Sequence, residues 1–441
     1  MKPYIFALAV MLNTQTSVAN ENEFKDVILS AADIIETQLY SETIGQEVAQ
    51  QIKQPDFIAY YATSEDKQAF AQKLSKALRQ VSGDNHIGIV FAPKDVERYR
   101  IREKAKVNDA ARTQNKENYQ HRLAESVAEN FGIRQLRVLD GDIGYIEMSY
   151  FDGFVDESAP VFESAMNFLS SSHIIILDLR RNGGGNSRIL PLFLGYFLGP
   201  EPVHFATRYE RWKGSQETLM TDNQVKGARF FDKPLYILTS GTTFSLAEHV
   251  TYHLKAFDRA TIVGERTYGG GKAFDPVVLN DDFYLRIPRI EMANAVTHDM
   301  YEEGKGILPD IAVSADSAFH VAYLAALQQL MLENDKNPSQ TDYLQWLQRV
   351  VAAEIDPPKQ QPVLPDIDEN QHFEEFRFSP RNGELWMSFR ELPWVKLQTL
   401  HDGYFYDDRS IQRQFRFIKT NGKWAVQVFR AKRPPNVIIE S

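Results

Sequence analysis

The stretch LYILTSGTTFSLAE, residues 235–248, joins a short apolar run directly to a helix-forming segment. Its first five residues have the length and apolar character of a buried strand, and a helix is predicted from Ser245 to Phe257. Ser245 would therefore lie at a helix N-terminus, where free backbone N–H groups and the positive dipole end stabilise a developing oxyanion. This favours a serine nucleophile. The competing interpretation is a plain capping box, with Ser245 at N-cap and Glu248 at N3.

A second junction of this kind lies upstream, in IIILDLRRNGGG at residues 174–185. Three successive glycines allow the backbone to approach a ligand closely and to direct N–H groups toward it. No Lys-Ser or Lys-Thr pair follows, so the phosphate-loop motif is excluded, and the spacing does not match the dinucleotide-binding fingerprint. Ligands of α/β sheets bind where strands end. The two junctions together predict an acyl-transfer site.

Strands and helices alternate from about Leu139 onward. The predicted elements are strands at 144–148, 174–179, 235–239 and 260–263, and helices at 159–169, from the glycines to about 197, and at 245–257. This alternation predicts an α/β layered core.

The flanking segments differ in composition from this core. Residues 22–82 show helical spacing, 94–130 are charged and helix-prone but too short for an inserted peptide-binding domain, and 373–437 contain strand patterns separated by Asn-Gly turns. The predicted organisation is a signal peptide (1–19), a helical N-terminal domain (20–83), the core (84–331), a linker with one helix (332–366) and a small antiparallel β-rich domain (367–441).

The N-terminus predicts export. Lys2 precedes a short apolar segment, residues 4–12, and Ser17-Val18-Ala19 is a small-x-small cleavage site. The apolar segment is too short to span a bilayer, so no stable membrane span is expected. With no cysteine in the chain, the expected location is a bacterial periplasm or the exterior.

The net charge and the missing cysteines exclude several functions. The charge is 49 − 59 = −10, which disfavours nucleic acid as a partner. The lack of cysteine excludes disulfides, thiolate metal sites and a cysteine nucleophile. No metal and no cofactor are expected.

These patterns alone do not decide which residue is the base that activates the serine. His249 is one helical turn from Ser245, but a serine at N-cap points away from it. His249 and His253 have the spacing of a metal pair but lack the HExxH glutamate. His86, in the DNH segment 84–86, is the non-local candidate. The loop YEEGKGILPD, residues 301–310, offers two carboxylates that could orient a histidine.

Together these segments resemble the C-terminal-processing (tail-specific) serine peptidase family, and most closely its branch related to the interphotoreceptor retinoid-binding protein. The matching stretches are residues 84–86, 130–134, 144–146, 178–185, 238–248, 259–265 and 304–310. The resemblance implies a ClpP/crotonase-like ββα core within an α/β fold, a helical N-terminal domain and a small C-terminal β domain.

The resemblance also implies the site. Ser245 is the nucleophile, His86 the general base and Glu303 its orienting partner, with Glu302 as the alternative if the loop register differs by one. The lysine that the tail-specific branch places 25 residues after the serine is replaced by Gly270, and Lys272 lies two residues away. The implied oxyanion donors are the N–H of Leu246 and that of Gly183 or Gly184.

The resulting prediction is an exported serine endopeptidase that acts on polypeptides. The alternative is a non-catalytic protein that binds a lipid or another apolar ligand on the same scaffold. A separate structural role for the β-rich domain, in gating or assembly, is compatible with both. The sequence does not specify the oligomeric state.

Overall fold

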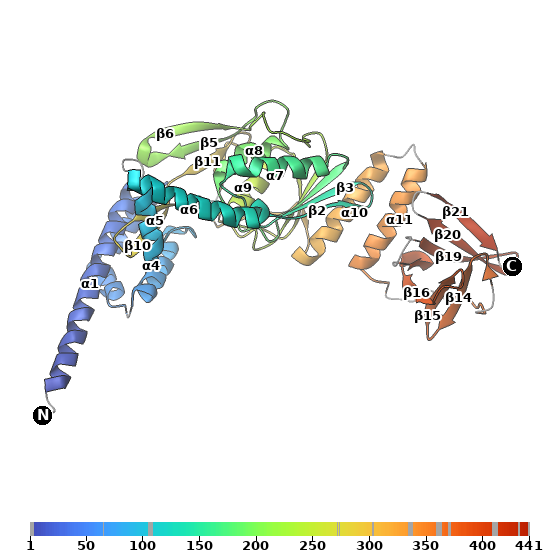
Figure 1. Ribbon diagram of the computed structural model, residues 1–441, viewed down its shortest axis with the longest axis horizontal. Helices are drawn as coiled ribbons and strands as arrows, with labels where there is room; N and C mark the ends of the chain where they lie inside the picture. The colour runs from blue at the N-terminus through green and yellow to red at the C-terminus, as the bar shows by residue number, and fades with distance from the viewer. Residues whose placement is uncertain are drawn as a thin grey trace. The chain divides into compact units, whose positions relative to one another are not determined.

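The computed structural model describes residues 4–64, 66–104, 109–270, 272, 274–301, 304–333, 338–358, 364–368, 372–407, 413–430 and 433–439 (Figure 1). The chain divides into two compact units, which are considered separately. Unit 1 comprises Met1–Leu136, Ile146–Ser171 and Leu177–Ala312, and unit 2 comprises Arg137–Tyr145, Ser172–Ile176 and Val313–Ser441.

Unit 1 begins with the predicted helical region. The helices are α1 (Tyr4–Gln38), α2 (Glu42–Ile52), α3 (Pro55–Ala62) and α4 (Lys67–Ser82). Their ends follow local rules: the Ser41 hydroxyl accepts from Ile44 N–H at the start of α2, Asp66 caps α4, and Gly83 ends α4 at φ +69°. The prediction of an N-terminal helical region is confirmed. The predicted signal-peptide residues 4–19 lie within α1, and cleavage stays a prediction.

The helices share one apolar core with a three-stranded sheet ordered β1-β10-β9. These strands are β1 (Gly88–Phe91), β9 (Phe274–Val278) and β10 (Phe283–Pro288), all antiparallel. Phe24 of α1 stacks on Phe70 of α4 with ring centroids 4.2 Å apart, and Phe283 meets both rings edge-on. Aromatic packing of this kind adds to the burial of the rings themselves. The N-terminal helices are thereby attached to a strand that follows the end of α4 by about 200 residues.

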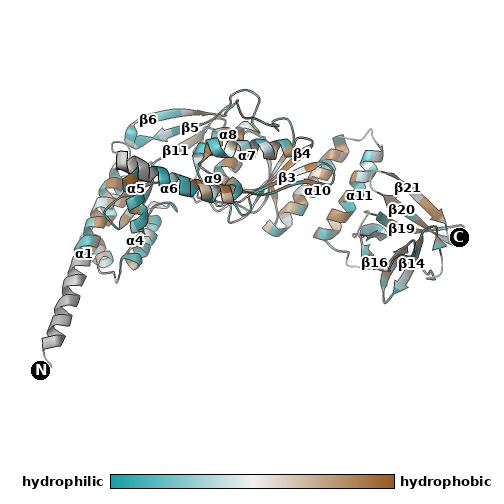
Figure 2. Ribbon diagram, in the orientation of Figure 1, coloured by the Kyte–Doolittle hydropathy of each residue, from teal (hydrophilic) through white to brown (hydrophobic). Residues whose placement is uncertain are grey.

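A six-stranded sheet, ordered β12-β8-β7-β4-β3-β2, provides the strand ends that carry the candidate site. Its strands are β2 (Ile133–Leu139), β3 (Ile143–Met148), β4 (Ile174–Asp178), β7 (Leu235–Thr239), β8 (Thr261–Gly264) and β12 (Ile311–Ala312). β7, β8 and β12 run parallel. All residues of β4 and β7 are buried, as expected for continuous apolar strands in a parallel sheet, and the ribbon of β4 is brown in Figure 2.

Further elements of unit 1 follow the sheet strands in the chain. The helices are α5 (Pro93–Lys104), α6 (Asp109–Ala128), α7 (Val155–Phe168), α8 (Leu190–Gly195) and α9 (Leu246–Ala256), with 3₁₀ turns at Asn130–Gly132, Ser187–Ile189 and Arg211–Lys213. A separate antiparallel sheet, ordered β11-β5-β6, contains β5 (His204–Glu210), β6 (Ser215–Met220) and β11 (Glu291–Asn294). The mixed α/β class is confirmed, and the ClpP/crotonase-like detail stays a prediction.

Unit 2 contains α10 (Ala315–Glu333), α11 (Pro338–Ile355) and two antiparallel sheets. The first sheet, β13-β14-β15-β16, is made of His372–Phe373, Phe376–Arg381, Glu384–Phe389 and Val395–Lys396. The second, β17-β18-β19-β20-β21, is made of Gln398–Thr399, Tyr404–Asp407, Arg413–Thr420, Lys423–Arg430 and Arg433–Ile439. A 3₁₀ turn lies at His401–Gly403. Their inward aromatic residues, including Phe373, Phe378 and Phe415, form one core. Among the described residues, no helix combines the length and apolar character needed to cross a membrane.

Candidate active site

Ser245 lies between strand β7 and helix α9, as the strand-to-helix pattern predicts. Its backbone has φ 55° and ψ −121°, a conformation that a residue with a side chain adopts only when its surroundings impose it. Two hydrogen bonds impose it here. Phe244 N–H donates to the Asn182 carbonyl at 3.1 Å, and Ser245 N–H donates to Glu248 Oε2 at 3.0 Å. The strained backbone makes Ser245 a candidate functional residue.

The Glu248 carboxylate organises the surroundings of Ser245. It is fully buried and accepts five hydrogen bonds. Oε1 accepts from Thr267 Oγ1 at 2.5 Å, Gly269 N–H at 2.8 Å and the Tyr301 hydroxyl at 2.8 Å, while Oε2 accepts from Ser245 N–H at 3.0 Å and Gly270 N–H at 2.8 Å. A buried carboxylate is stable only when its oxygens are satisfied in this way. Glu248 thus attaches the serine turn to two distant loops.

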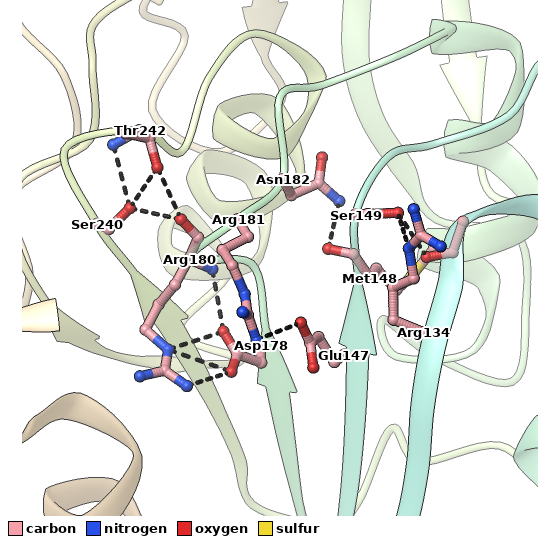
Figure 3. Close-up of polar contacts among 11 residues, drawn as sticks. Arg134, Glu147, Met148, Ser149, Asp178, Arg180, Arg181, Asn182, Ser240 and Thr242 are labelled. Atoms are coloured by element: carbon pink, nitrogen blue, oxygen red, sulfur yellow. Dashed lines mark hydrogen bonds and ion pairs between the residues drawn. The ribbon is translucent and has the colours of Figure 1, made fainter. Parts of the chain in front are cut away.

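The loop that follows β4 is held by a second carboxylate, shown in Figure 3. The Arg180 guanidinium binds Asp178 through Nε, at 3.0 and 3.1 Å from the two oxygens, and through Nη2 at 2.6 Å. The Arg180 carbonyl accepts from the hydroxyls of Ser240 at 2.5 Å and Thr242 at 2.9 Å, which follow β7. The two strand-to-loop junctions are therefore bonded to one another.

Two of the three predicted oxyanion donors lie directly beside Ser245. A Cβ placed on Gly184 would lie 2.7 Å from Ser245 Cβ and 2.9 Å from Leu246 N, so only glycine allows this approach. Leu246 is the first residue of α9, and its N–H has no acceptor within the helix. In this structure Gly184 N–H donates to Asn182 Oδ1 at 2.9 Å, and Gly183 N–H makes a longer bond of 3.4 Å to the Ser149 carbonyl.

His86 reaches the site from the segment before β1. It is 3% exposed, its backbone N–H donates to Asp84 Oδ1 at 2.7 Å, and its Nδ1 lies 3.8 Å from the same oxygen. The imidazole stacks on the ring of Phe244, the residue before the serine, with centroids 5.0 Å apart and planes inclined by 18°. The structure thus brings the non-local histidine next to the serine turn.

Gly270 occupies the position at which the tail-specific branch carries its lysine. A Cβ on Gly270 would lie 1.9 Å from Phe244 Cε2. The space in which a side chain would begin is therefore filled by the Phe244 ring. Lys272, two residues later, forms an ion pair of 2.7 Å with Glu291 and lies 3.4 Å from the ring centroid of Tyr40.

The local candidate His249 is buried on α9, packed beside His253 and Tyr301 with ring centroids 6.0 and 5.6 Å away. His253 is fully buried, and its Nδ1 lies 3.0 Å from the Asn294 amide nitrogen. Burial, with a smaller effect from His249, lowers the pKa of His253 to about 3. Within the described part of the chain, no three His, Asp or Glu side chains form a group that could hold a metal ion.

Glu302 and Glu303, the predicted orienting residues, lie outside the described residues. Their neighbours on both sides are attached to the site. The Tyr301 hydroxyl donates to Glu248, and Gly304 N–H donates to the Gly269 carbonyl at 2.7 Å. A small, partly open pocket beside α9 is lined by His249, Lys272, Ile290, Glu291, Met292, Met300 and Tyr301.

Comparison with known proteins shows a family similarity over the segment that contains Ser245. The family model "Peptidase family S41" matches residues 142–313, which include Ser245, Glu248 and the glycine loop. The predicted resemblance to C-terminal-processing peptidases is thereby confirmed for this segment, while His86 precedes it.

Curated relatives of the S41 region carry matching names. A carboxyl-terminal-processing protease of Synechocystis is 27% identical over 201 residues, covering 43% of this chain and 44% of that protein. A probable CtpA-like serine protease of Staphylococcus epidermidis is 26% identical over 140 residues, covering 32% and 27% of the two chains. The chain thus spans less than half the length of these relatives.

Solved structures similar to this chain include a lipoprotein from Streptococcus agalactiae, with a TM-score of 0.43 and 20% identity over 69% of this chain and 95% of that one. A putative peptidase from Parabacteroides merdae has a TM-score of 0.44 and 14% identity, covering 67% and 90%.

Sequence reasoning assigned Glu248 only a capping role and gave Asp178 and Arg180 no role of their own. Glu248 does bond Ser245 N–H, as a capping box requires, but four of its five donors come from residues 267–301. No local pattern contains that information. Asp178 could have been noticed as an acidic residue at the end of an otherwise apolar strand, since such a group requires a partner when buried.

Proposed function

We propose that this protein is an exported serine peptidase that hydrolyses peptide bonds with Ser245, His86 and Glu303. The observation that carries the proposal is the turn at Ser245. A serine with positive φ begins a helix, lies against Gly184, and is preceded by a residue whose ring packs on a buried histidine. The S41 match and the names of the curated relatives support the same reaction class.

In the proposed reaction, Ser245 Oγ attacks the peptide carbonyl while His86 accepts the hydroxyl proton. The Oγ–C bond forms, and the negative charge on the carbonyl oxygen is stabilised by Leu246 N–H and by Gly183 or Gly184 N–H. The C–N bond then breaks as His86 returns the proton to the leaving amine. Water, deprotonated by His86, cleaves the acyl-enzyme and restores the serine. Glu303 stabilises the imidazolium in both half-reactions.

The donor geometry favours Gly183 over Gly184 as the second oxyanion donor. The 3.4 Å bond from Gly183 N–H is long, whereas the 2.9 Å bond from Gly184 N–H to Asn182 is near ideal. Gly184 then contributes by permitting the close approach to Ser245. The substrate class is a polypeptide. The segment between β1 and β2, which contains α5 and α6, is too short for an inserted peptide-binding domain. We therefore expect cleavage to depend only weakly on the C-terminus of the substrate.

The proposal includes export to the periplasm or exterior. It also includes a relationship to the family branch that uses a histidine base and a glutamate partner. The signal-like residues 2–19 support the first, and Gly270 in place of lysine supports the second.

The test is labelling with a fluorophosphonate probe. The wild-type protein should label, and Ser245→Ala and His86→Ala should not, while His249→Ala should retain labelling. Glu303→Gln should slow labelling, and Glu302→Gln should not. Retained labelling in Ser245→Ala would contradict the nucleophile. Loss in His249→Ala but not His86→Ala would move the base to α9. A folded wild type that never labels but binds an apolar ligand saturably would favour the binding-protein alternative.

A further inference from the structure

Phe244, immediately before Ser245, contacts His86, the loop after β8 and the Gly270 position, where the tail-specific branch carries its lysine. Its ring stacks on His86 at 5.0 Å, and Tyr268 meets it edge-on at 5.1 Å and 89°. A Cβ on Gly270 would penetrate it, at 1.9 Å from Cε2 and 2.7 Å from Cζ. One side chain thus fills the space between the histidine and the loop after β8.

The backbone on both sides of this ring is fixed. Phe244 N–H donates to the Asn182 carbonyl at 3.1 Å, and the Phe244 carbonyl accepts from Ala247 N–H at 3.2 Å. Gly184 packs against the same carbonyl, at 2.9 Å from its would-be Cβ. These contacts fix the backbone that carries the ring, and the packing against His86, Tyr268 and Gly270 limits the rotamers that the ring can adopt.

Gly270 is fixed as well. Its N–H donates to the buried Glu248 Oε2 at 2.8 Å, next to the bond from Gly269 N–H to Oε1 at 2.8 Å. A side chain at position 270 could not be accommodated by moving the loop without breaking these charge-assisted bonds. It would have to displace the Phe244 ring from between His86 and Tyr268.

We infer that Phe244 is a positioning residue that orients the His86 imidazole and prevents any side chain at position 270 from entering the site. The choice between a histidine base and a lysine at position 270 is then decided by this ring. The effect on catalysis rests on the proposed peptidase function, whereas the packing of Phe244 on His86 and its conflict with position 270 can be measured without activity.

The orientation of His86 is tested by NMR of the full-length protein with labelled histidine, assigned with His86→Gln. Protons over the face of an aromatic ring are shifted upfield, so Phe244→Leu should move the His86 ring signals downfield, and Phe244→Tyr should leave them near the wild-type positions. Phe162→Leu, a buried phenylalanine that packs on Phe193, is the matched control and should not move them. Unchanged His86 signals in Phe244→Leu would overturn the inference. If Phe244→Leu does not fold, Phe244→Met provides the same comparison.

The steric role is tested with a double-mutant cycle on the thermal midpoint. Gly270→Ala should lower the midpoint strongly in the wild type and much less in Phe244→Ala, because the ring with which it collides is gone. Equal decreases in both backgrounds would contradict the role of the ring in excluding side chains at position 270.

The catalytic consequence is tested by the rate of fluorophosphonate labelling per folded molecule. Phe244→Leu should label about 10- to 100-fold more slowly, the range expected when a base is misplaced by about an ångström, and Phe244→Tyr should restore the rate. If Phe244→Leu displaced the His86 NMR signals but was labelled at the normal rate, only the role of Phe244 in positioning the base would be refuted. An unlabelled wild type would refute the proposed function, while the NMR comparison and the cycle would still report on Phe244.

Discussion

The two strand-to-loop junctions of unit 1, after β4 and after β7, build their turns in opposite ways. After β4, the chain satisfies its own amides: Asp178 accepts from Arg180 N–H at 3.0 Å, and Asn182 accepts from Gly184 N–H at 2.9 Å. After β7, the acceptor is Glu248, inside the following helix, and it collects donors from the serine and from residues 267, 269, 270 and 301.

The two junctions therefore have different roles: the β4 loop supports the site, and the β7 turn carries the candidate nucleophile Ser245. The β4 loop shapes its own turn with short-range bonds from Asp178 and Asn182, and bonds from Ser240 and Thr242 to the Arg180 carbonyl attach it to the β7 junction. The β7 turn keeps a strained serine only while a buried carboxylate holds loops that are up to 56 residues away in sequence, from Ser245 to Tyr301. Variants at the two junctions should therefore differ in how far their effects spread.

The largest effect is expected from Glu248→Ala. Removing a buried carboxylate leaves five donors without an acceptor, so we expect a loss of about 3–5 kcal/mol in the free energy of unfolding, together with the loss of serine labelling. Urea unfolding and probe labelling measure both. Glu248→Gln, which keeps the shape and one oxygen, should lose less. A stable, reactive Glu248→Ala protein would show that the β7 turn does not depend on this carboxylate.

The next effect is expected from Gly184→Ala. Its φ of +101° alone costs a residue with a Cβ about 1–3 kcal/mol, and the 2.7 Å contact with Ser245 adds to this. The variant should be destabilised, and its labelling should be at least tenfold slower. Gly214→Ala is the control, since Gly214 has φ +60° but open space around its Cβ position. Equal effects of the two substitutions would show that strain, and not contact with the serine, explains the result.

Adjacent arginines in the β4 loop should differ. Arg180→Ala leaves the buried Asp178 without its guanidinium, so a loss of about 2 kcal/mol is expected. Arg181 pairs with the buried Glu147 through one contact of 2.8 Å, and its own side chain is 73% exposed, so water can replace the guanidinium and Arg181→Ala should cost less than Arg180→Ala. Thermal unfolding at low and high salt measures both. If Arg181→Ala cost as much as Arg180→Ala, the exposure of the arginine side chain would not determine the loss of stability at this junction.

The smallest effect concerns acid sensitivity near the β7 turn. Burial lowers the pKa of His253 from 6.5 to about 3, so between these values the unfolded chain binds a proton that the folded chain does not. Stability is therefore complete above about pH 6.5 and falls as the pH falls. The expected loss from this group at pH 5.5 is about 1.4 kcal/mol relative to pH 7.5.

Unfolding of His253→Gln over this pH range checks the prediction, with His121→Gln as control because His121 is exposed on α6. The control should keep the wild-type pH slope, and His253→Gln should reduce it. An unchanged slope in His253→Gln would place the acid-sensitive group elsewhere.

Much of the fold and part of the site follow from local signals. The N-terminal helices, the apolar strands β4 and β7 and the turn at Ser245 are encoded by periodicity, caps and apolar runs that act within a few residues. The three glycines predicted a close backbone approach, and the structure places Gly184 against Ser245. The conformations of single residues and short segments can be predicted from the sequence because they depend on residues that are neighbours along the chain.

The partners of Ser245 were decided by the tertiary structure. Glu248 bonds to Thr267, Gly269, Gly270 and Tyr301 because β8 pairs with β7 and β12 pairs with β8, so the loops after β8 and before β12 reach the end of β7. The stack of Phe244 on His86 joins segments almost 160 residues apart (about 158 along the chain), and the same ring fills the space above Gly270. Such contacts depend on the burial and packing of the whole unit, which no spacing along the chain encodes.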